Sequence, residues 1–462
     1  MLNRDWLQDA MHAALSGGAD FCEIFVENRI NSSISMLMGK VETAVSGIDF
    51  GVGLRLYRGT RSVYAYTSEN DRASLIQLAK DAAQAIEGAS KDTDITLRRQ
   101  DVKKINVIEQ DPSGLPLQKK VEVMRAAHKA AREYDELITQ VQVGYGDTRQ
   151  EVLIVNSEGL MAEDERIRTR VTIRAVASKD GEMQEGFYGP GASRGFELYD
   201  MIDVPGYARE AARIAVTMVN AGPCPSGHMP VIIDNGFGGV VFHEACGHGL
   251  EATAVAKGTS VYAGRIGEQV ASPLVTAIDD GTLPYAWGST AIDDEGNPTR
   301  KNVLIEKGIL KGYMVDRLNG RKMGMESTGS GRRQSYRFAP TSRMTNTYID
   351  NGTSTKEEII AATEKGLYAK YMGGGSVNPA TGDFNFAVME GYLVADGKID
   401  KPVRGATLIG KGEEVLKKID MVGNNLDYGQ GMCGSVSGSV PANVGQPTIR
   451  IESITVGGRE ES

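Results

Sequence analysis

The chain has 462 residues, of which 24% are charged and 41% are hydrophobic, and its formal net charge is −9. This balance is typical of a globular protein and excludes a disordered one. No run approaches the ~18 apolar residues of a membrane-spanning helix, and no block of Lys and Arg offers the basic face that nucleic acid binding needs, so we expect neither membrane nor nucleic acid as a partner.

The N-terminus predicts a folded helix rather than an export signal. Asp5 and Asp9 interrupt the segment where a signal peptide needs an apolar block. The four Cys, at positions 22, 224, 246 and 433, are widely scattered, which favours reduced thiols. We therefore expect a cytoplasmic location.

Helical and strand patterns alternate through the first half of the chain. The pattern predicts helices over 6–15, 72–86, 117–134 and 207–219. It predicts strands over 21–27, 32–37, 41–46, 137–145, 151–156 and 168–178, with a Gly-rich hairpin region over 51–57. A polar segment over 98–114 ends in an Asp-Pro-Ser-Gly turn.

A domain boundary is predicted at 221–227, where two Pro and two Gly follow the helical segment. We expect domains over 1–224 and 225–462 in an α+β protein. The first is an α/β sandwich-like domain. The second is a predominantly antiparallel β domain of short strands and turns, which carries a metal-binding helix and a helix over 354–365.

Two short motifs carry no predicted function. Gly51-Val52-Gly53 lacks the third Gly of a dinucleotide loop, and a strand pattern continues where a helix should begin, so we reject a Rossmann interpretation. Asp293-Asp294-Glu295 could bind a cation, but we interpret it as a solvated turn.

The chemistry-bearing motif is His243-Glu244-x-x-x-His248. Two imidazoles suit Zn²⁺, and a Glu beside the first His can take a proton from water without ligating the metal. Chance would produce this spacing roughly 0.007 times in a chain of this composition. On a regular helix, residues five apart point about 140° away from each other. Gly247 and Gly249 weaken the helix there, so we predict a distorted helix, with a wide turn of the π type bringing the two His into line.

A catalytic zinc needs a third protein ligand and an open position. Cys246 lies between the two His but is typical of a core residue, and His228 precedes a strand-like segment, which favours a structural role. Glu251 could ligate the metal or orient His248. Cys433 lies among small residues that leave its backbone free to approach another group, and it could equally be a ligand or simply fit there.

Several motifs together resemble the TldD/PmbA family of zinc peptidases, and specifically its TldD branch, because the TldE (PmbA) branch lacks the His and Glu. The resemblance extends over essentially the whole chain. Besides the His-Glu-x-x-x-His motif it rests on Asp294-Glu295-Gly296-x-Pro298, Pro340-x-x-Arg343-Met344-Thr345-Asn346, Gly373-Gly374-Gly375, Thr381-Gly382-x-Phe384 and Gly431-x-Cys433-Gly434.

The resemblance implies that His243, His248 and Cys433 are the zinc ligands and that Glu244 is the general base. It also implies a dimer around an internal cavity, formed with a second copy or with a TldE-like paralogue, that hydrolyses short, unfolded or modified-precursor peptides. A non-catalytic peptide-binding or assembly subunit is the alternative function. Independently of the resemblance, extended peptides are expected to add a strand to an exposed sheet edge.

A thiolate ligand makes zinc a weaker Lewis acid, so other groups should stabilise the oxyanion of the transition state. Arg343 and Tyr336 are the candidates for this role. The four Arg between positions 332 and 343 could instead be solvated or paired with carboxylates.

Overall fold

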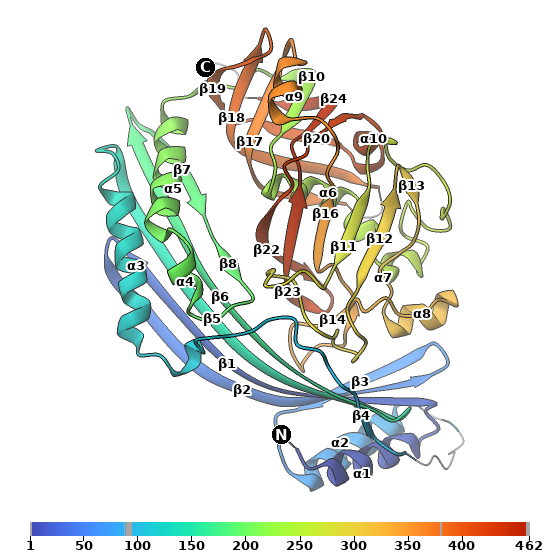
Figure 1. Ribbon diagram of the computed structural model, residues 1–462. Coiled ribbons are helices and arrows are strands. Elements are labelled where there is room, and N and C mark those ends of the chain that lie inside the picture. The colour runs from blue at the N-terminus through green and yellow to red at the C-terminus, as the bar shows by residue number, and fades with distance from the viewer. Residues whose placement is uncertain (1, 87, 89–94, 379–380, 459–462) are drawn as a thin grey trace.

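Four long antiparallel strands dominate the N-terminal half of the computed structural model, which describes residues 2–86, 88, 95–378 and 381–458. They are β1 (Phe21–Leu37), β2 (Lys40–Arg58), β5 (Ile138–Asn156) and β6 (Leu160–Lys179). The sheet runs β3-β2-β1-β5-β6-β4, with β7 and β8 also paired to β6. Figure 1 shows it as one long curved layer beneath and beside the C-terminal half. The shorter strands are β3 (Arg61–Thr67), β4 (Arg98–Arg99), β7 (Glu182–Tyr188) and β8 (Gly191–Ala192).

These strands are longer than the sequence predicted. The expected segments over 21–27 and 32–37 form the single strand β1, and those over 137–145 and 151–156 form β5. β1 pairs with β2 from Phe21 opposite Tyr57 to Leu37 opposite Lys40. The polar middle of β1 continues the ladder because it faces the C-terminal half of the chain, as the hydrogen bond from Arg29 to the carbonyl of Gln334 shows. Polar side chains there interrupt the hydrophobic pattern but not the strand.

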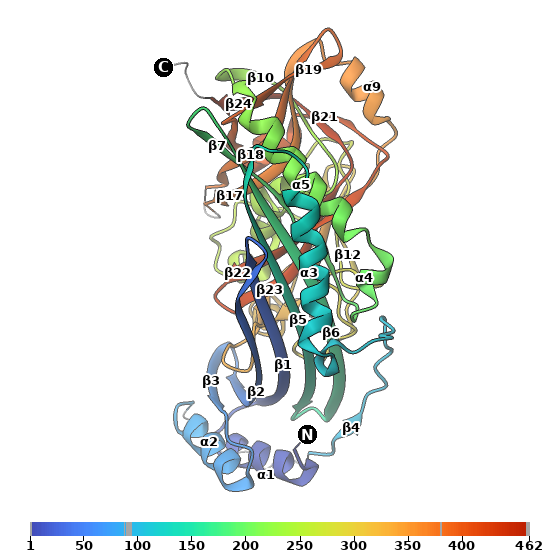
Figure 2. The same ribbon diagram turned by 90° about the vertical axis from the view of Figure 1, so that its left-hand side faces the viewer.

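Two pairs of helices cover the two ends of this sheet (Figures 1 and 2). α1 (Arg4–Leu15) and α2 (Arg72–Gln84) pack at one end, and Asn3 and Asp71 cap them by accepting hydrogen bonds from backbone amides. α3 (Leu117–Arg132) and α5 (Val204–Val219) pack at the other. Each pair buries its own apolar cluster against the sheet. The strand segments between the two clusters are therefore free to contact the C-terminal half.

The C-terminal half contains two further sheets, whose pairings are mostly antiparallel. The first runs β17-β10-β24-β20-β18-β19-β9, and a pairing between β17 and β18 closes five of its strands into a ring. The second runs β13-β12-β11-β16-β23-β22. The parallel pairings are β10 with β17, β9 with β19 and β16 with β23. The predicted α+β class is confirmed.

The bounds of these elements are as follows. The first sheet comprises β9 (Gly222–Pro223), β10 (Gly227–Ile233), β17 (Lys365–Val377), β18 (Asp383–Ala395), β19 (Lys398–Arg404), β20 (Thr407–Lys411), β21 (Ile419–Val422) and β24 (Ile449–Gly457). The second comprises β11 (Ala277–Asp280), β12 (Lys301–Glu306), β13 (Ile309–Leu310), β16 (Asn346–Ile349), β22 (Asp427–Ser435) and β23 (Gly438–Gln446), and β14 (Gly331–Arg332) pairs with β15 (Thr341–Ser342). The short helices are η1 (Pro112–Gly114), α4 (Leu198–Met201), η2 (Phe237–Gly239), α6 (Val240–Ala245), η3 (Gly247–Leu250), α7 (Ala252–Val255), α8 (Arg317–Met323), α9 (Lys356–Ala361) and α10 (Gly412–Lys417).

The helix predicted over 354–365 is the shorter α9, because the chain enters β17 at Lys365. At the predicted boundary, the amide of Cys224 donates to the carbonyl of Arg404, which attaches this segment to the C-terminal sheet. The division into 1–224 and 225–462 stays a prediction. Within the described ranges, no helix is both long and apolar enough to cross a bilayer.

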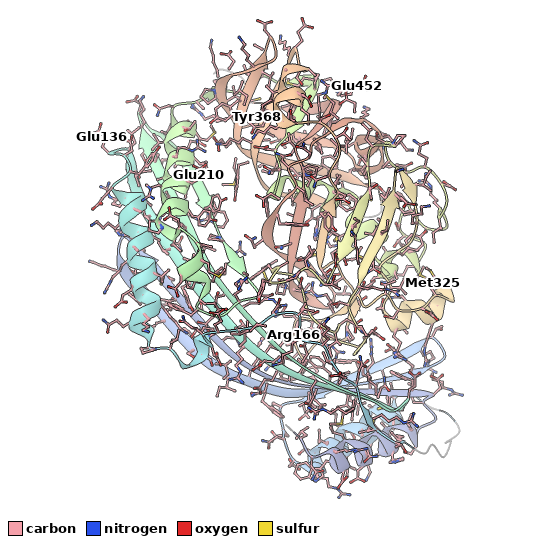
Figure 3. The ribbon with its side chains drawn as sticks, viewed as in Figure 1. Glu136, Arg166, Glu210, Met325, Tyr368 and Glu452 are labelled. Atoms are coloured by element: carbon pink, nitrogen blue, oxygen red, sulfur yellow. The ribbon has the colours of Figure 1, made fainter. Side chains whose placement is uncertain are left out.

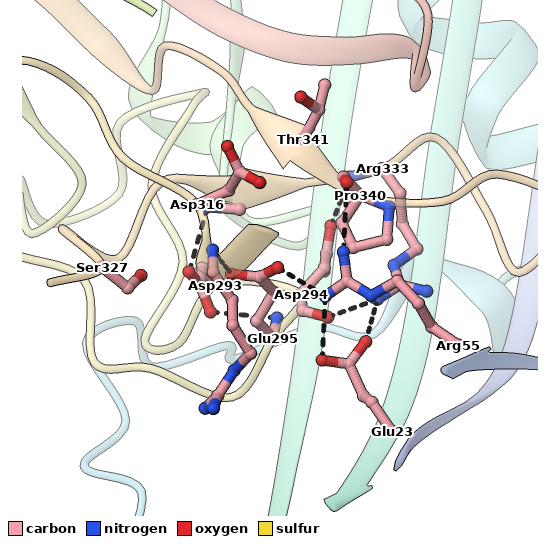
Figure 4. A network of polar contacts seen from close by, with 12 residues as sticks. Glu23, Arg55, Asp293, Asp294, Glu295, Asp316, Ser327, Arg333, Pro340 and Thr341 are labelled. Atoms are coloured by element: carbon pink, nitrogen blue, oxygen red, sulfur yellow. Dashed lines mark hydrogen bonds and ion pairs between the residues drawn. The ribbon is translucent and has the colours of Figure 1, made fainter. Parts of the chain in front are cut away.

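The turn at Asp293-Asp294-Glu295 is buried, so the prediction that it is solvated was wrong. All three side chains are at most 3% exposed. Arg55 bridges Glu23 and Glu295, at 3.1 and 2.5 Å, in the network shown in Figure 4. Burial and the adjacent Glu295 raise the pKa of Asp293 to about 8. The charges are buried because the turn inserts against β1 and β2, which supply the matching Arg55.

A second set of ion pairs extends the same contact. Arg333 pairs with Glu23 at 2.8 Å, and Arg166 of β6 pairs with Asp294 at 2.6 Å. Arg166 is labelled in Figure 3, where β6 passes under the C-terminal half. Buried, hydrogen-bonded ion pairs thus join the two halves of the chain.

Candidate metal centre

The chain breaks between the two histidines of the motif. α6 carries His243 and ends at Cys246, whose φ and ψ of −129° and −47° leave the helical region. The separate 3-10 turn η3 then carries His248. A Cβ at Gly247 would lie 2.4 Å from the sulfur of Met344, so a larger residue would collide there. The structure therefore reorients His248 by ending one helix and starting a tighter one, and not by the wide π turn that we expected.

Three side chains from two distant segments meet at this break. His243 Nε2 lies 3.2 Å from Cys433 Sγ, and His248 Nε2 lies 3.5 Å from the same sulfur. The three potential ligand atoms all lie within 4.8 Å of one another. Ligand atoms of a tetrahedral zinc with one S and two N donors lie roughly 3.5 Å apart, given the usual bond lengths. The spacing of these atoms therefore fits one small ion.

The charge state of Cys433 suits metal binding. Burial alone would raise the pKa of this thiol, but the adjacent His243 and His248 outweigh burial and lower the pKa to about 3. Burial would lower the pKa of His248, whereas Glu251 and Cys433 raise it well above its usual value. The thiolate is the form of cysteine that ligates metals, so the sulfur is ready to act as a ligand.

Each imidazole is oriented by a hydrogen bond on its other nitrogen. His243 Nδ1 lies 3.0 Å from Thr347 Oγ1 on β16, and His248 Nδ1 lies 3.2 Å from Glu251 Oε2. Such partners fix the ring and its tautomer in metal sites. Of the two roles considered for Glu251, ligating the metal or orienting His248, this contact matches the second. The sequence analysis missed Thr347, since a Thr in a short buried strand carries no separate signal.

The other candidate ligands lie apart from this cluster. Cys246 is fully buried in the apolar core, and burial raises the pKa of its thiol to about 12. His228 is exposed on β10, and its Nδ1 lies 3.3 Å from Thr455 Oγ1. Neither belongs to the group of metal-binding side chains found in the described part of the chain.

Glu244 borders the cluster without belonging to it. Its Oε2 lies 3.7 Å from His248 Nε2, and its side chain is 27% exposed. The three members of the cluster are less exposed, with His243 3%, Cys433 5% and the His248 side chain 14% exposed. Glu244 is therefore a carboxylate beside the cluster that water can reach.

Arg343 reaches the cluster from behind, whereas Tyr336 lies elsewhere. Arg343 is fully buried and donates to the carbonyl of Cys433 and to Ser437 Oγ, the latter at 3.0 Å. Its guanidinium holds the segment that carries the sulfur. Tyr336 packs against Gly51 in another cluster, and its hydroxyl lies 3.4 Å from Asp49. Of these two residues, only Arg343 contacts the cluster, and it does so through the backbone of Cys433.

Comparison with known proteins places this arrangement in a class. Three family descriptions match the chain in order: PmbA/TldA metallopeptidase domain 1 over residues 22–86, the central domain over 110–219 and the C-terminal domain over 226–458. The chain is a metallopeptidase. It belongs to the PmbA/TldD family, as the sequence motifs predicted.

Relatives extend over almost the full length. The chain is 40% identical to the Metalloprotease TldD homolog of Haemophilus influenzae, with 95% of this chain and 93% of that protein covered. It is 33% identical to a metalloprotease of Methanothermobacter thermautotrophicus, covering 95% and 96%. The Zinc metalloprotease TldD homolog of Saccharolobus solfataricus is 29% identical, covering 56% of this chain and 58% of that protein.

Solved structures share the fold. A putative modulator of a DNA gyrase from Thermotoga maritima superposes with a TM-score of 0.80 at 22% identity, covering 98% of this chain and 99% of the other. TldE from Thermococcus kodakarensis gives a TM-score of 0.78 at 22% identity, covering 98% and 100%. At this identity the likeness shows the fold alone.

Proposed function

We propose that this protein is a zinc-dependent peptidase in which His243, His248 and Cys433 hold the metal and Glu244 is the general base. The observation that carries the proposal is the convergence of two Nε2 atoms and one Sγ atom within 4.8 Å, with Glu244 beside them. Three protein ligands and one open position are the arrangement of a catalytic zinc, whereas structural zinc sites have four protein ligands.

The residues present fit a zinc ion. The lowered pKa of Cys433 favours its thiolate form, and each imidazole has its Nδ1 engaged by a hydrogen-bond partner, so that each Nε2 faces the site. When bound, the metal supplies a Lewis acid that activates water and polarises a carbonyl group.

Glu244 supplies the proton transfers. Its carboxylate accepts a proton from the water that attacks the scissile carbonyl, and then donates that proton to the departing amine. Partial exposure of Glu244 gives water and substrate access, and its carboxylate lies beside the group of His243, His248 and Cys433 without belonging to it.

The buried partners act as positioning residues. Thr347 and Glu251 orient the two imidazoles, and Arg343 fixes the backbone of Cys433. Because Arg343 is fully buried, we assign it to holding the backbone of Cys433 and not to stabilising the oxyanion. The group that stabilises the oxyanion is thus to be sought among partly exposed donors near Glu244.

We further propose that the substrates are short, unfolded or modified-precursor peptides, bound extended in the cavity of a dimer, and that the protein acts in the cytoplasm. The partner is a second copy or a TldE-like paralogue. The alternative function, a non-catalytic peptide-binding subunit, predicts no zinc and no hydrolysis. The thiolate–imidazole cluster favours the enzyme.

Metal analysis and one substitution test the proposal. Purified protein should contain about one zinc per chain, and it should cleave members of a peptide library, read by mass spectrometry, until a chelator removes the metal. Glu244→Gln should keep the zinc and lose hydrolysis, and Glu357→Gln on the exposed face of α9 is the control. Wild-type turnover by Glu244→Gln would refute the role of this carboxylate.

A further inference from the structure

A cavity of about 560 Å³ lies between the N-terminal sheet and the β22–β23 hairpin. Strands β1, β5 and β6 form one wall, and Met432, Ser439 and Pro441 of the hairpin lie on the other. Its size is that of a small-molecule or peptide-residue site. Six arginines line it: Arg29, Arg166, Arg168, Arg170, Arg332 and Arg333.

Three of these six arginines come from one face of β6. Side chains alternate along a strand, so Arg166, Arg168, Arg170 and Arg174 lie on the same side. The two at the ends of the row have carboxylate partners, Asp294 for Arg166 and Glu185 for Arg174. The two in the middle do not.

Arg168 and Arg170 bond only to backbone carbonyl oxygens. Arg168 donates to Trp287 and Ser289, at 2.9 and 3.1 Å, and Arg170 donates to Gly189 and Gln430, each at 3.0 Å. Over the described residues, no carboxylate lies within ion-pair distance of either guanidinium. Their hydrogen bonds are partly satisfied, and neither charge has a direct ion-pair partner among the described residues.

Arg332 is a third arginine of this cavity without a direct ion pair among the described residues. It is 4% exposed, and its Nη1 donates to the carbonyl of Met344. Its remaining N–H groups have no hydrogen-bond partner in the part of the chain described, and no ion pair is formed there. By contrast, Arg333 pairs with Glu23, and Arg29 lies 3.8 Å from carboxylate oxygens of Glu27 and Asp49.

Arg168 and Arg332 are buried near each other and repel each other, while Asp164, Asp294 and Asp279 act on these two guanidiniums only from beyond ion-pair distance. Burial, together with the neighbouring arginines, lowers the pKa of Arg168 to about 9, and burial lowers the pKa of Arg332 to about 10. A role limited to joining the two halves would account for the bonds to carbonyls. It would not account for three guanidiniums without a direct ion pair among the described residues, because a charge that is buried without such a partner costs free energy.

We propose that this cavity binds a carboxylate group of the peptide substrate, through Arg168, Arg170 and Arg332. The inference rests on the proposed peptidase function, and it names acidic or free-C-terminal peptides as the preferred class. Planar guanidinium groups match carboxylates in geometry and charge, and Trp287 and Met432 give the same cavity apolar surface for the rest of a peptide. Met432 directly precedes Cys433, so a ligand here lies beside the strand that carries the metal-binding sulfur.

Calorimetric titration of the zinc-loaded Glu244→Gln protein tests this without turnover. The probes are four N-acetylated pentapeptides of Ala with either Glu or Gln at the centre, each with a free or an amidated C-terminus. We expect at least one carboxylate-bearing peptide to bind ~10- to 100-fold more tightly than the fully neutral peptide, as charged hydrogen bonds in a buried site would give. Tighter binding of the Glu peptides would identify a side-chain carboxylate as the ligand, and tighter binding of the peptides with a free C-terminus would identify the terminal carboxylate. Equal affinity for all four peptides would overturn the proposal.

Substitutions locate the effect. Arg332→Gln and, separately, Arg170→Gln should remove most of the preference for carboxylate while leaving affinity for the neutral peptide within about twofold. Arg174→Gln, on the same face of β6 but paired with Glu185, is the matched control and should keep the preference. If Arg332→Gln does not fold, as judged by its thermal unfolding, Arg170→Gln decides, since Arg170 is less buried. Loss of preference in all three variants alike would refute a specific site.

Two further measurements distinguish carboxylate binding from the binding of another anion, and the cavity assignment from the peptidase function. Inorganic phosphate that displaces the carboxylate peptide at equal or lower concentration would show that the cavity selects another anion, and the proposal would fail. Hydrolysis by the wild type tests the peptidase function independently. A peptidase without carboxylate preference would refute the cavity assignment alone, and carboxylate-selective binding without hydrolysis would refute the peptidase function alone.

Discussion

Arg343 donates a hydrogen bond to the backbone carbonyl of Cys433 and so fixes the strand that presents the sulfur to His243 and His248. The same guanidinium binds the carbonyl of Gly438 at 2.8 Å, on the other strand of the hairpin. One buried side chain thus sets the position of a proposed metal ligand through its backbone.

Replacing Arg343 by Lys should weaken zinc binding. A Lys ammonium lacks the planar fork and cannot serve both strands of the hairpin at once. We expect zinc affinity to fall by about tenfold or more, the usual loss when a partner that orients a ligand is removed. Competition with a chromophoric chelator measures this, with the exposed Arg337→Lys as control. Unchanged affinity in Arg343→Lys would contradict the positioning role.

Replacing Cys433 by Ser should abolish stoichiometric zinc binding, because a hydroxyl is a poor zinc ligand at neutral pH whereas this thiol is ionised. Cys246→Ala is the matched control, since that thiol is close in sequence to both His but buried in the core. Elemental analysis of the dialysed proteins should find about one zinc per chain in the control and little in Cys433→Ser. The reverse result would assign the third ligand to Cys246.

Asp279 should make the stability depend on pH between about 4 and 6. Burial raises the pKa of this carboxyl from 3.8 to about 6, although Thr345 donates to it from its amide and its hydroxyl. A raised pKa in the folded state means that the contribution of Asp279 to stability is complete below pH ~4 and is lost as the pH rises through ~6.

Asp279→Asn removes the titration, and its amide can still bond to Thr345 if the oxygen accepts from the backbone amide and the NH2 group donates to the hydroxyl. The free energy of unfolding of this variant, minus that of the wild type, should therefore increase by about 2.4 kcal/mol between pH 4 and pH 7. Denaturant unfolding at several pH values measures the difference. The exposed Asp400→Asn should track the wild type throughout. A constant difference for Asp279→Asn would show that folding leaves the pKa of this carboxyl unchanged.

Removing Arg55 should destabilise the contact between the two halves. Arg55→Met leaves Glu23 and Glu295 buried without this partner, and such losses cost about 3–5 kcal/mol. Adding Glu295→Gln to the same chain should recover part of the loss. Arg72→Met removes an exposed ion pair with Asp9 and should change the free energy of unfolding by less than about 1 kcal/mol. Equal effects of Arg55→Met and Arg72→Met would refute the contribution of the buried network.

The residues of the His-Glu-x-x-x-His motif could be predicted from sequence. The residues that other segments of the chain add to the site could not be predicted from residue chemistry alone. The spacing of His243, Glu244 and His248 indicates a metal site, and the glycines beside His248 indicate a break in the helix. Cys433 lies 190 residues beyond His243, and residue chemistry alone left its role open until the family resemblance favoured it. Thr347 reaches His243 only because β16 pairs in parallel with β23, a contact that no local pattern encodes.

The fold shows the same limit. Helix bounds agree closely where a buried stripe and a capping residue coincide, as in α1 and α2. The long strands were underestimated, and Asp293-Asp294-Glu295 was assigned to the surface, because in both places polar residues face another part of the protein instead of solvent. The alternate arginines of β6 were a signal of this kind, since a row of charges on one strand face requires a polar partner surface.

The separation of the proposed ligands along the chain has a consequence for biosynthesis. When His243 and His248 have been synthesised, the ribosome must still add the last strands before Cys433 can join them. Cys433 lies on β22, which pairs with β23, and β23 pairs in turn with β16. An incomplete or truncated polypeptide therefore lacks a finished proteolytic centre. On the proposed function, peptidase activity would begin only after translation is essentially complete. This delay would protect the nascent chain and nearby polypeptides from premature cleavage.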